Sequence, residues 1–258
     1  MLIDTHCHLD DKKLLDRQQE IINNFEKDGV ELAVTSSASL QESLEAVRLA
    51  NIYPNVYATV GVHPELAKEY DENTRKELER LSYDKKVVAI GEIGLDYHYE
   101  GYSKEAQMKA FTDQILLANK VGLPVVFHIR DAMGDFLQII RAYKSYFKNG
   151  AIVHSFSGSV EVAKELTSYG FLLGINGICT FKNASNILEV IKNIPLKYLV
   201  LETDAPYLTP EPFRGRLNEP KYTIYMARKI AELKGISEGE VIEETSKNAK
   251  EIYRKIGD

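Results

Sequence analysis

Six side chains with the chemistry of metal ligands are spread along this chain. His6 and His8 are separated by one residue, so that one strand face could direct both imidazoles at one ion. This pair alone is weak evidence, because a lone histidine is usually a hydrogen-bonded core or surface residue. The full set of six gives the stronger signal: His6, His8, Glu92, His128, His154 and Asp204.

A mixed set of imidazoles and carboxylates can hold two divalent ions. Imidazole suits zinc, iron, nickel and copper, whereas carboxylates suit magnesium and manganese. A central carboxylate such as Glu92 could bridge the two ions. Two ions about 3.5–4 Å apart can clamp the attacking and leaving oxygens of a displacement, and they lower the pKa of bound water. The set therefore predicts metal-assisted hydrolysis.

The elements that position these residues must bring together segments almost two hundred residues apart. Hydrophobic periodicity predicts strands alternating with helices. The strands are expected over residues 2–7, 32–35, 56–62, 87–93, 124–129, 151–153, 171–175 and 198–201. The helices are expected over residues 12–27, 41–50, 72–81, 104–121, 135–147, 160–169, 184–191 and 222–233, with one further helix over 238–255.

Eight strand–helix units in 258 residues predict an α/β fold, namely a parallel (β/α)8 TIM barrel with an extra C-terminal helix. A doubly wound open sheet is the alternative. No composition break divides residues 1–258, so we expect a single hydrolase domain. The C-terminal strand ends of a barrel converge on one face that carries the active site. All six candidate ligands, with His63 and Glu202, lie at or just beyond such ends.

Strand alternation supports the same arrangement. Side chains two residues apart point to the same face of a strand. Apolar residues at even spacing before the candidate ligands should therefore fill the barrel interior, with the ligands above them. These residues are Val88 and Ile90 before Glu92, Val126 before His128, and Val200 before Glu202 and Asp204.

Composition excludes several classes of protein. The chain is 44% hydrophobic, which argues against disorder, and no apolar run reaches the roughly 20 residues of a membrane span. The net charge of −6 argues against a broad surface that coats nucleic acid, but not against an enzyme acting on one phosphodiester. Two distant cysteines, Cys7 and Cys179, fit a reducing cytoplasm. Without a coiled-coil heptad, a monomer is favoured.

Several longer motifs carry a family resemblance, and together they span essentially the whole chain in order. This sequence resembles the TatD-related metal-dependent deoxyribonucleases, within the amidohydrolase superfamily. The motifs are Asp4-Thr5-His6-Cys7-His8-Leu9, Gly61-Val62-His63-Pro64, Ile90-Gly91-Glu92-Ile93-Gly94-Leu95-Asp96-Tyr97, Pro124 to Ala132, Val153-His154-Ser155-Phe156-Ser157-Gly158, Leu201 to Leu208 and Phe213 to Pro220.

The resemblance implies a TIM barrel, two divalent ions per subunit (Mg, Mn or Zn) and a division of the ligands. One ion would lie on His6, His8, Glu92 and Asp204, and the other on Glu92, His128 and His154. The implied activity is hydrolysis of DNA phosphodiesters, as an exonuclease working from the 3′ end of single-stranded or frayed DNA.

Two positions depart from the family pattern. Glu65 follows Pro64 where the family often has a second histidine, and His98 stands where an aromatic residue is usual. Neither belongs to the six expected ligands, but both could alter substrate contacts.

Roles beyond metal binding can be assigned to six residues. Asp204 is expected to take a proton from the attacking water in addition to binding metal, so that Asp204 and Glu92 are the catalytic pair. Glu202 could orient a ligand or form a strand-end ion pair. His63, Arg130 and Arg214 are expected to contact substrate phosphate, although a structural hydrogen bond is an open alternative for His63.

Two other functions remain open at this stage. The same ligand set could hydrolyse a small ester, an amide or an aminoacyl-tRNA, because the metal chemistry is shared. A metal-stabilised scaffold without catalysis is the other alternative.

Overall fold

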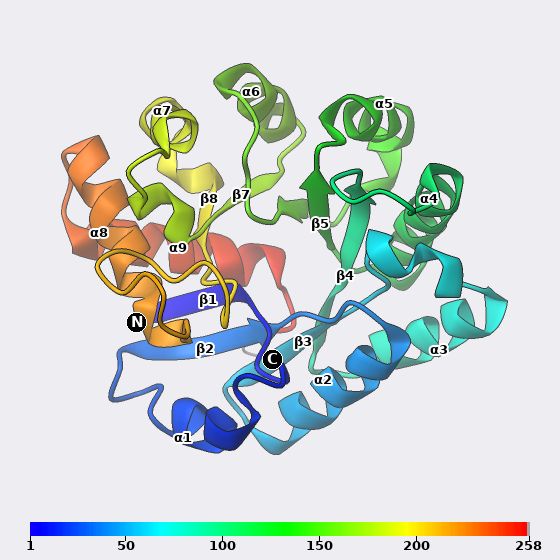
Figure 1. Ribbon diagram of the computed structural model, residues 1–258, viewed down its shortest axis with the longest axis horizontal. Helices are drawn as coiled ribbons and strands as arrows, with labels where there is room; N and C mark the ends of the chain where they lie inside the picture. The colour runs from blue at the N-terminus through cyan, green and yellow to red at the C-terminus, as the bar shows by residue number, and fades with distance from the viewer. Residues whose placement is uncertain (257–258) are drawn as a thin grey trace.

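Eight parallel strands form one sheet in which each strand pairs with the next along the chain (Figure 1). The computed structural model describes residues 1–256. The strands are β1 (Leu2–Cys7), β2 (Val30–Thr35), β3 (Val56–Val60), β4 (Val87–Asp96), β5 (Val125–Arg130), β6 (Ala151–Val153), β7 (Leu172–Ile175) and β8 (Leu199–Leu201).

The ring closes between β8 and β1. The hydroxyl of Thr5 donates to the carbonyl of Leu201 at 3.0 Å. Just beyond the two strands, the Asp204 amide donates to the His6 carbonyl at 2.9 Å, and the His8 amide donates to the Ala205 carbonyl at 2.7 Å. These contacts complete a nearly closed TIM barrel, which confirms the predicted fold over an open sheet.

Helices surround the strands on the outside of the barrel (Figure 1). They are α1 (Gln18–Asn23), α2 (Leu40–Ile52), α3 (Glu72–Ser82), α4 (Lys104–Val121), α5 (Met133–Tyr143), α6 (Val160–Ser168), α7 (Ser185–Asn193) and α8 (Thr223–Lys234), and a further helix, α9 (Glu238–Ile252), crosses behind the strands in the view of Figure 1. Short 3-10 turns are η1 (Leu15–Arg17), η2 (Pro64–Glu69), η3 (Lys144–Tyr146), η4 (Gly177–Thr180), η5 (Leu196–Tyr198) and η6 (Pro220–Tyr222). Among residues 1–256, no helix is both long and apolar enough to cross a bilayer.

The predicted length of the first helix is wrong. The predicted helix over residues 12–27 is instead a 3-10 turn followed by the six residues of α1, because the exposed residues 15–17 offer no buried face. The other strands and helices lie where they were expected, with ends shifted by a few residues. The last helix ends at Ile252 rather than at residue 255, and β4 continues to Asp96.

Two apolar layers lie on either side of the strands. The interior cluster contains Val88, Val126 and Val200, as the alternation predicts. Ile90 does not join them, and the prediction for this residue is wrong. It packs in the outer cluster, and the register between β3 and β4 shifts between Val87 and Ala89, so that simple alternation fails between Val88 and Ile90.

The extra helix α9 packs across the N-terminal ends of β1 and β8. Tyr253, directly after α9, is fully buried in the interior cluster, and its hydroxyl donates to the Thr5 carbonyl at 3.2 Å. The Asn248 side chain donates to the Leu199 carbonyl at 2.8 Å. The helix therefore fills the end of the barrel opposite the candidate ligands.

We predict that Tyr253→Ala lowers the free energy of unfolding by about 3–5 kcal/mol, the usual cost of truncating a buried aromatic side chain. Urea unfolding would measure this change in the free energy of unfolding. Tyr83→Ala is the matched control, because Tyr83 is 65% exposed, and it should change stability by less than about 0.5 kcal/mol. Equal effects of the two substitutions on stability would contradict the role of Tyr253 in filling this end of the barrel.

Candidate metal centre

Ligand-type side chains from most of the strands meet at the C-terminal face of the barrel. They form the floor of a cavity of about 850 Å³. His6 lies fully buried beneath it. The candidate ligands that line the cavity are His8 after β1, Glu92 on β4, His128 on β5, His154 after β6 and Asp204 after β8, and His63 after β3 joins them.

Ser36 fixes the orientation of the first two histidines. His8 Nδ1 lies 3.0 Å from the Ser36 carbonyl oxygen, which can only accept, so this nitrogen carries the proton. His8 Nε2 then faces the Asp204 carboxylate, 3.4 Å away. His6 Nδ1 pairs with the Ser36 hydroxyl at 3.1 Å, and its buried Nε2 has no hydrogen-bond partner. Both Nε2 atoms are therefore available to an ion.

Glu92 lies at the centre of the cluster. Its carboxylate is 2.8 Å from His128 Nδ1 and 3.3 Å from His6 Nε2. His63 and His154 each approach it to 3.9 Å. Burial would raise the pKa of Glu92, but the charges of His6 and His154 and the hydrogen bond from His128 hold it well below its usual value. Glu92 is thus a carboxylate whose position suits a bridge.

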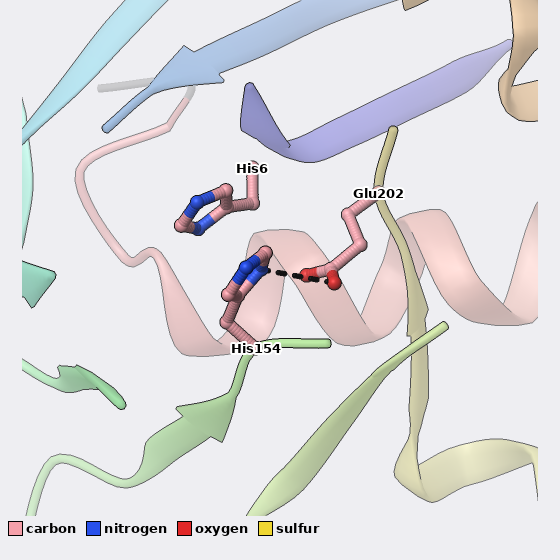
Figure 2. Close-up of side chains that lie close together, drawn as sticks. All are labelled: His6, His154 and Glu202. Atoms are coloured by element: carbon pink, nitrogen blue, oxygen red, sulfur yellow. Dashed lines mark ion pairs between the residues drawn. The ribbon is translucent and has the colours of Figure 1, made fainter. Parts of the chain in front are cut away.

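Glu202 orients His154 (Figure 2). Glu202 Oε1 lies 3.0 Å from His154 Nδ1 and accepts from the Ser155 amide at 2.7 Å. His154 Nε2 therefore points away from Glu202 and lies 3.6 Å from Asp204. Burial would lower the pKa of His154, but the charges of Glu202 and Glu92 raise it to about 10. Of the two roles considered for Glu202, the structure favours that of orienting a ligand.

Gly174 makes room for Glu202. A Cβ atom placed on Gly174 would lie 2.2 Å from Glu202 Oε2. Glu202 is fully buried, so it has no free space into which it could retreat. The glycine on β7 is therefore part of the support for His154.

Asp96 was missed by the sequence analysis. Its carboxylate lies 2.9 Å from His128 Nε2, which leaves Nδ1 on the side of Glu92. Burial would raise the pKa of Asp96, but His128 lowers it. Asp96 is four residues beyond Glu92, a spacing that returns to the same strand face and could have identified it.

His63 has the opposite tautomer from His8. Its Nδ1 accepts from the Glu65 amide at 3.2 Å, so in the neutral ring Nε2 carries the proton and points into the cluster. Burial and the neighbouring His128 lower the pKa of His63 to about 3, which keeps the ring neutral. His63 therefore presents a hydrogen-bond donor to the cavity rather than a metal-binding lone pair.

Asp204 is held in place by the contacts that close the barrel. It has a left-handed backbone with φ of 60°, a conformation that aspartate tolerates better than most residues. The adjacent Thr203 donates its amide to the fully buried Asp4 at 2.8 Å. Burial would raise the pKa of Asp204, but His8 and His154 lower it. Asp4, like Asp96, supports the site and was not identified from the sequence.

The residues present fit divalent cations. His6, His8 and Glu92 place donor atoms within 4.8 Å of one another, as do His6, His154 and Glu202. The buried Nε2 of His6, which has no hydrogen-bond partner, is the clearest indication of a cation site. A buried polar atom without a partner is costly unless a ligand binds it. His6, His8, Glu92, His128, His154 and Asp204 would hold the ions, with Glu202 and Asp96 behind them.

The expected substrate contacts differ in position. Arg130 lies on the cavity rim. Arg214 is not among the residues that line the cavity, and its guanidinium lies 3.7 Å from the centre of the Phe181 ring. Of the two departures from the family pattern, Glu65 lines the cavity, whereas the exposed His98 pairs with Asp131 at 2.8 Å outside it.

A barrel with a histidine–carboxylate cluster of this kind at its C-terminal face defines the class of TIM-barrel metal-dependent hydrolases. The chain belongs to the TatD family: the family described as TatD related DNase matches residues 3–254. Membership of a hydrolase family favours an enzyme over the metal-stabilised scaffold.

Individual relatives and a solved structure support the same family assignment. The chain is 41% identical to the uncharacterized metal-dependent hydrolase YabD of Bacillus subtilis, covering 98% of this chain and 99% of that protein. It is 33% identical to YcfH of Escherichia coli K12, also described as an uncharacterized metal-dependent hydrolase, covering 98% and 95%. The crystal structure of the TatD homologue YjjV from Escherichia coli K12 superposes with a TM-score of 0.92 at 28% identity, covering 98% of each chain.

We predict that Gly174→Ala weakens metal binding by about 10- to 100-fold, the usual effect of disturbing a partner behind a metal ligand. The added methyl group would push Glu202 away from His154. Competition with a chelating dye measures the affinity. Gly134→Ala is the matched control, because a Cβ there meets nothing within 4 Å, and its affinity should equal that of the wild type. Unchanged affinity in Gly174→Ala would contradict this account of Glu202.

The tautomers predict different metal contents for two histidine variants. His8→Ala should lose metal affinity by at least about 10- to 100-fold. His63→Asn should keep its metal, because asparagine can still accept from the Glu65 amide and the lost Nε2 proton is not a ligand. Elemental analysis after dialysis measures both. Loss of metal in His63→Asn comparable to that in His8→Ala would show that His63 is a ligand.

Proposed function

We propose that this chain is a two-metal deoxyribonuclease that removes nucleotides from the 3′ end of single-stranded or frayed DNA. The observation that carries the proposal is the buried ligand cluster around Glu92, at the floor of a cavity whose donors suit a phosphodiester. Two ions, which could be Mg, Mn or Zn, would be held by the six candidate ligands, with Glu92 at the centre of the cluster. The family description, TatD related DNase, supports the same activity.

The charge of the cavity supports a requirement for bound cations. Its lining residues include seven carboxylates and only three lysines and arginines, so without cations it would repel a polyanion. Two divalent ions would add four positive charges at the floor and offset this excess. Net acidity of the chain is thus compatible with a nucleic-acid substrate, provided that the ions bind first.

Three side chains have direct roles in the proposed reaction. Bound ions would hold the phosphate and lower the pKa of the attacking water. Asp204 lies beside His8 and His154, and it takes the proton of that water as the new P–O bond forms. His63 donates from Nε2 to a phosphate oxygen, and Arg130 on the rim binds a neighbouring phosphate. The electron pair of the broken P–O bond leaves with the nucleoside oxygen.

The test uses 5′-labelled single-stranded oligonucleotides incubated with metal-loaded protein. We expect a ladder of shortened labelled products that appears with Mg, Mn or Zn and disappears with chelator. Glu92→Gln should lose nearly all activity and most bound metal. The control is Arg214→Ala, because Arg214 lies outside the cavity lining, and it should retain activity close to the wild-type level.

Other outcomes would overturn parts of the proposal. No release of nucleotides with any of the ions would exclude the deoxyribonuclease. Faster turnover of ester, amide or aminoacyl-tRNA substrates than of DNA would favour the alternative hydrolase. Asp204→Asn should lose more activity than metal, and equal losses would remove its role as the base.

A further inference from the structure

Two exposed tyrosines lie on the rim of the cavity on opposite sides of the metal centre. Tyr99 follows β4 and Tyr207 follows β8, and the strand order places β4 and β8 across the barrel from each other. They are 52% and 42% exposed, respectively. An exposed aromatic ring is a surface on which a nucleobase can stack, whatever its sequence.

Tyr207 is held in a fixed position. Its hydroxyl donates to Asp11 at 2.7 Å, and Lys13 Nζ lies 4.4 Å from the centre of its ring. The ring also meets His8, a candidate ligand, edge-on with centroids 6.4 Å apart. A base stacked on the ring face that Lys13 does not cover would therefore lie next to the ligand cluster.

Tyr99 has an equivalent setting on the other side. The Arg130 guanidinium lies 5.2 Å from the centre of its ring, and the His98 ring meets it edge-on at 4.8 Å. The ion pair of His98 with Asp131 ties this segment to the end of β5. Each tyrosine thus combines an exposed ring with one basic side chain, a pairing typical of single-stranded nucleic-acid sites.

Neighbouring tyrosines lack these features. Tyr97 is half-buried, donates its hydroxyl to Asp135 at 2.8 Å and lies under Lys104, away from the cavity lining. Tyr102 is 40% exposed, but it does not line the cavity either. The selection of Tyr99 and Tyr207 therefore rests on position as well as on exposure.

We propose that Tyr99 and Tyr207 form two base-stacking subsites, which bind the unpaired bases on either side of the scissile phosphodiester. This inference rests on the proposed nuclease function and specifies its substrate as a strand with unstacked bases. In a duplex the same bases stack on their neighbours, so a paired end must fray before it can occupy both subsites.

The test pairs each tyrosine with the base it would stack on. Oligonucleotides carry a single abasic residue on one side or the other of the terminal phosphodiester. Tyr99→Ala and Tyr207→Ala should each lower kcat/KM by roughly 5- to 150-fold on the full substrate. Each variant should show no further loss on the substrate that lacks its own base, and it should keep its sensitivity to the other abasic position.

Matched variants separate stacking from general damage to the rim. Tyr99→Phe and Tyr207→Phe should retain most activity, since they keep the ring. Tyr102→Ala should match the wild type on every substrate. Equal losses in Tyr99→Ala or Tyr207→Ala on base-bearing and abasic substrates would overturn the inference, as would no loss in either.

A binding measurement gives a readout that does not depend on turnover. An oligonucleotide with 2-aminopurine beside a phosphorothioate linkage should lose fluorescence on binding wild-type protein and regain it in the matching alanine variant. Unchanged quenching in both variants would overturn the subsites. An inactive metal-loaded wild type would instead overturn the proposed nuclease, so the two failures can be told apart.

Discussion

Burial of the Glu92 carboxylate is the constraint on which the rest of the site depends. An isolated charge in the interior of a protein is costly, and it is tolerated only when opposite charges and hydrogen bonds surround it. Here the surrounding groups are imidazoles from four different strand ends, with His128 and His6 nearest. Those imidazoles need partners of their own, which explains the buried Ser36 behind His6, Asp96 behind His128 and Glu202 behind His154.

The contacts that complete the barrel also build the site. The seam between β8 and β1 is closed by backbone hydrogen bonds of His6, His8 and Asp204, all candidate ligands. The hydrogen bond from the Thr203 amide to the buried Asp4 carboxylate stabilises the same seam. Formation of the barrel and assembly of the ligand set are therefore one event, and a chain that closed the seam poorly would lose metal binding before it lost its helices.

The sequence revealed the ligands because they recur at strand ends, and it revealed the barrel because strands and helices alternate. It could not reveal which nitrogen of each histidine faces the site. That depends on contacts such as His63 with the Glu65 amide, set by a local turn after β3. Ile90 escaped prediction because a register shift between β3 and β4 breaks the alternation. The position of Arg214 could not be predicted, because the path of a long loop carries no periodic signal.

The acidic cavity links the metal chemistry to substrate recognition. Its carboxylates exceed its basic residues, so bound cations would serve as the main attraction for a phosphodiester as well as the reactive centre. Attraction of this kind acts on the phosphate and does not depend on the base. A site that acts on ends must still distinguish an unpaired strand from a duplex, whose phosphates are equally charged. Aromatic rings on the rim provide that distinction, because only an unstacked base is free to lie against them.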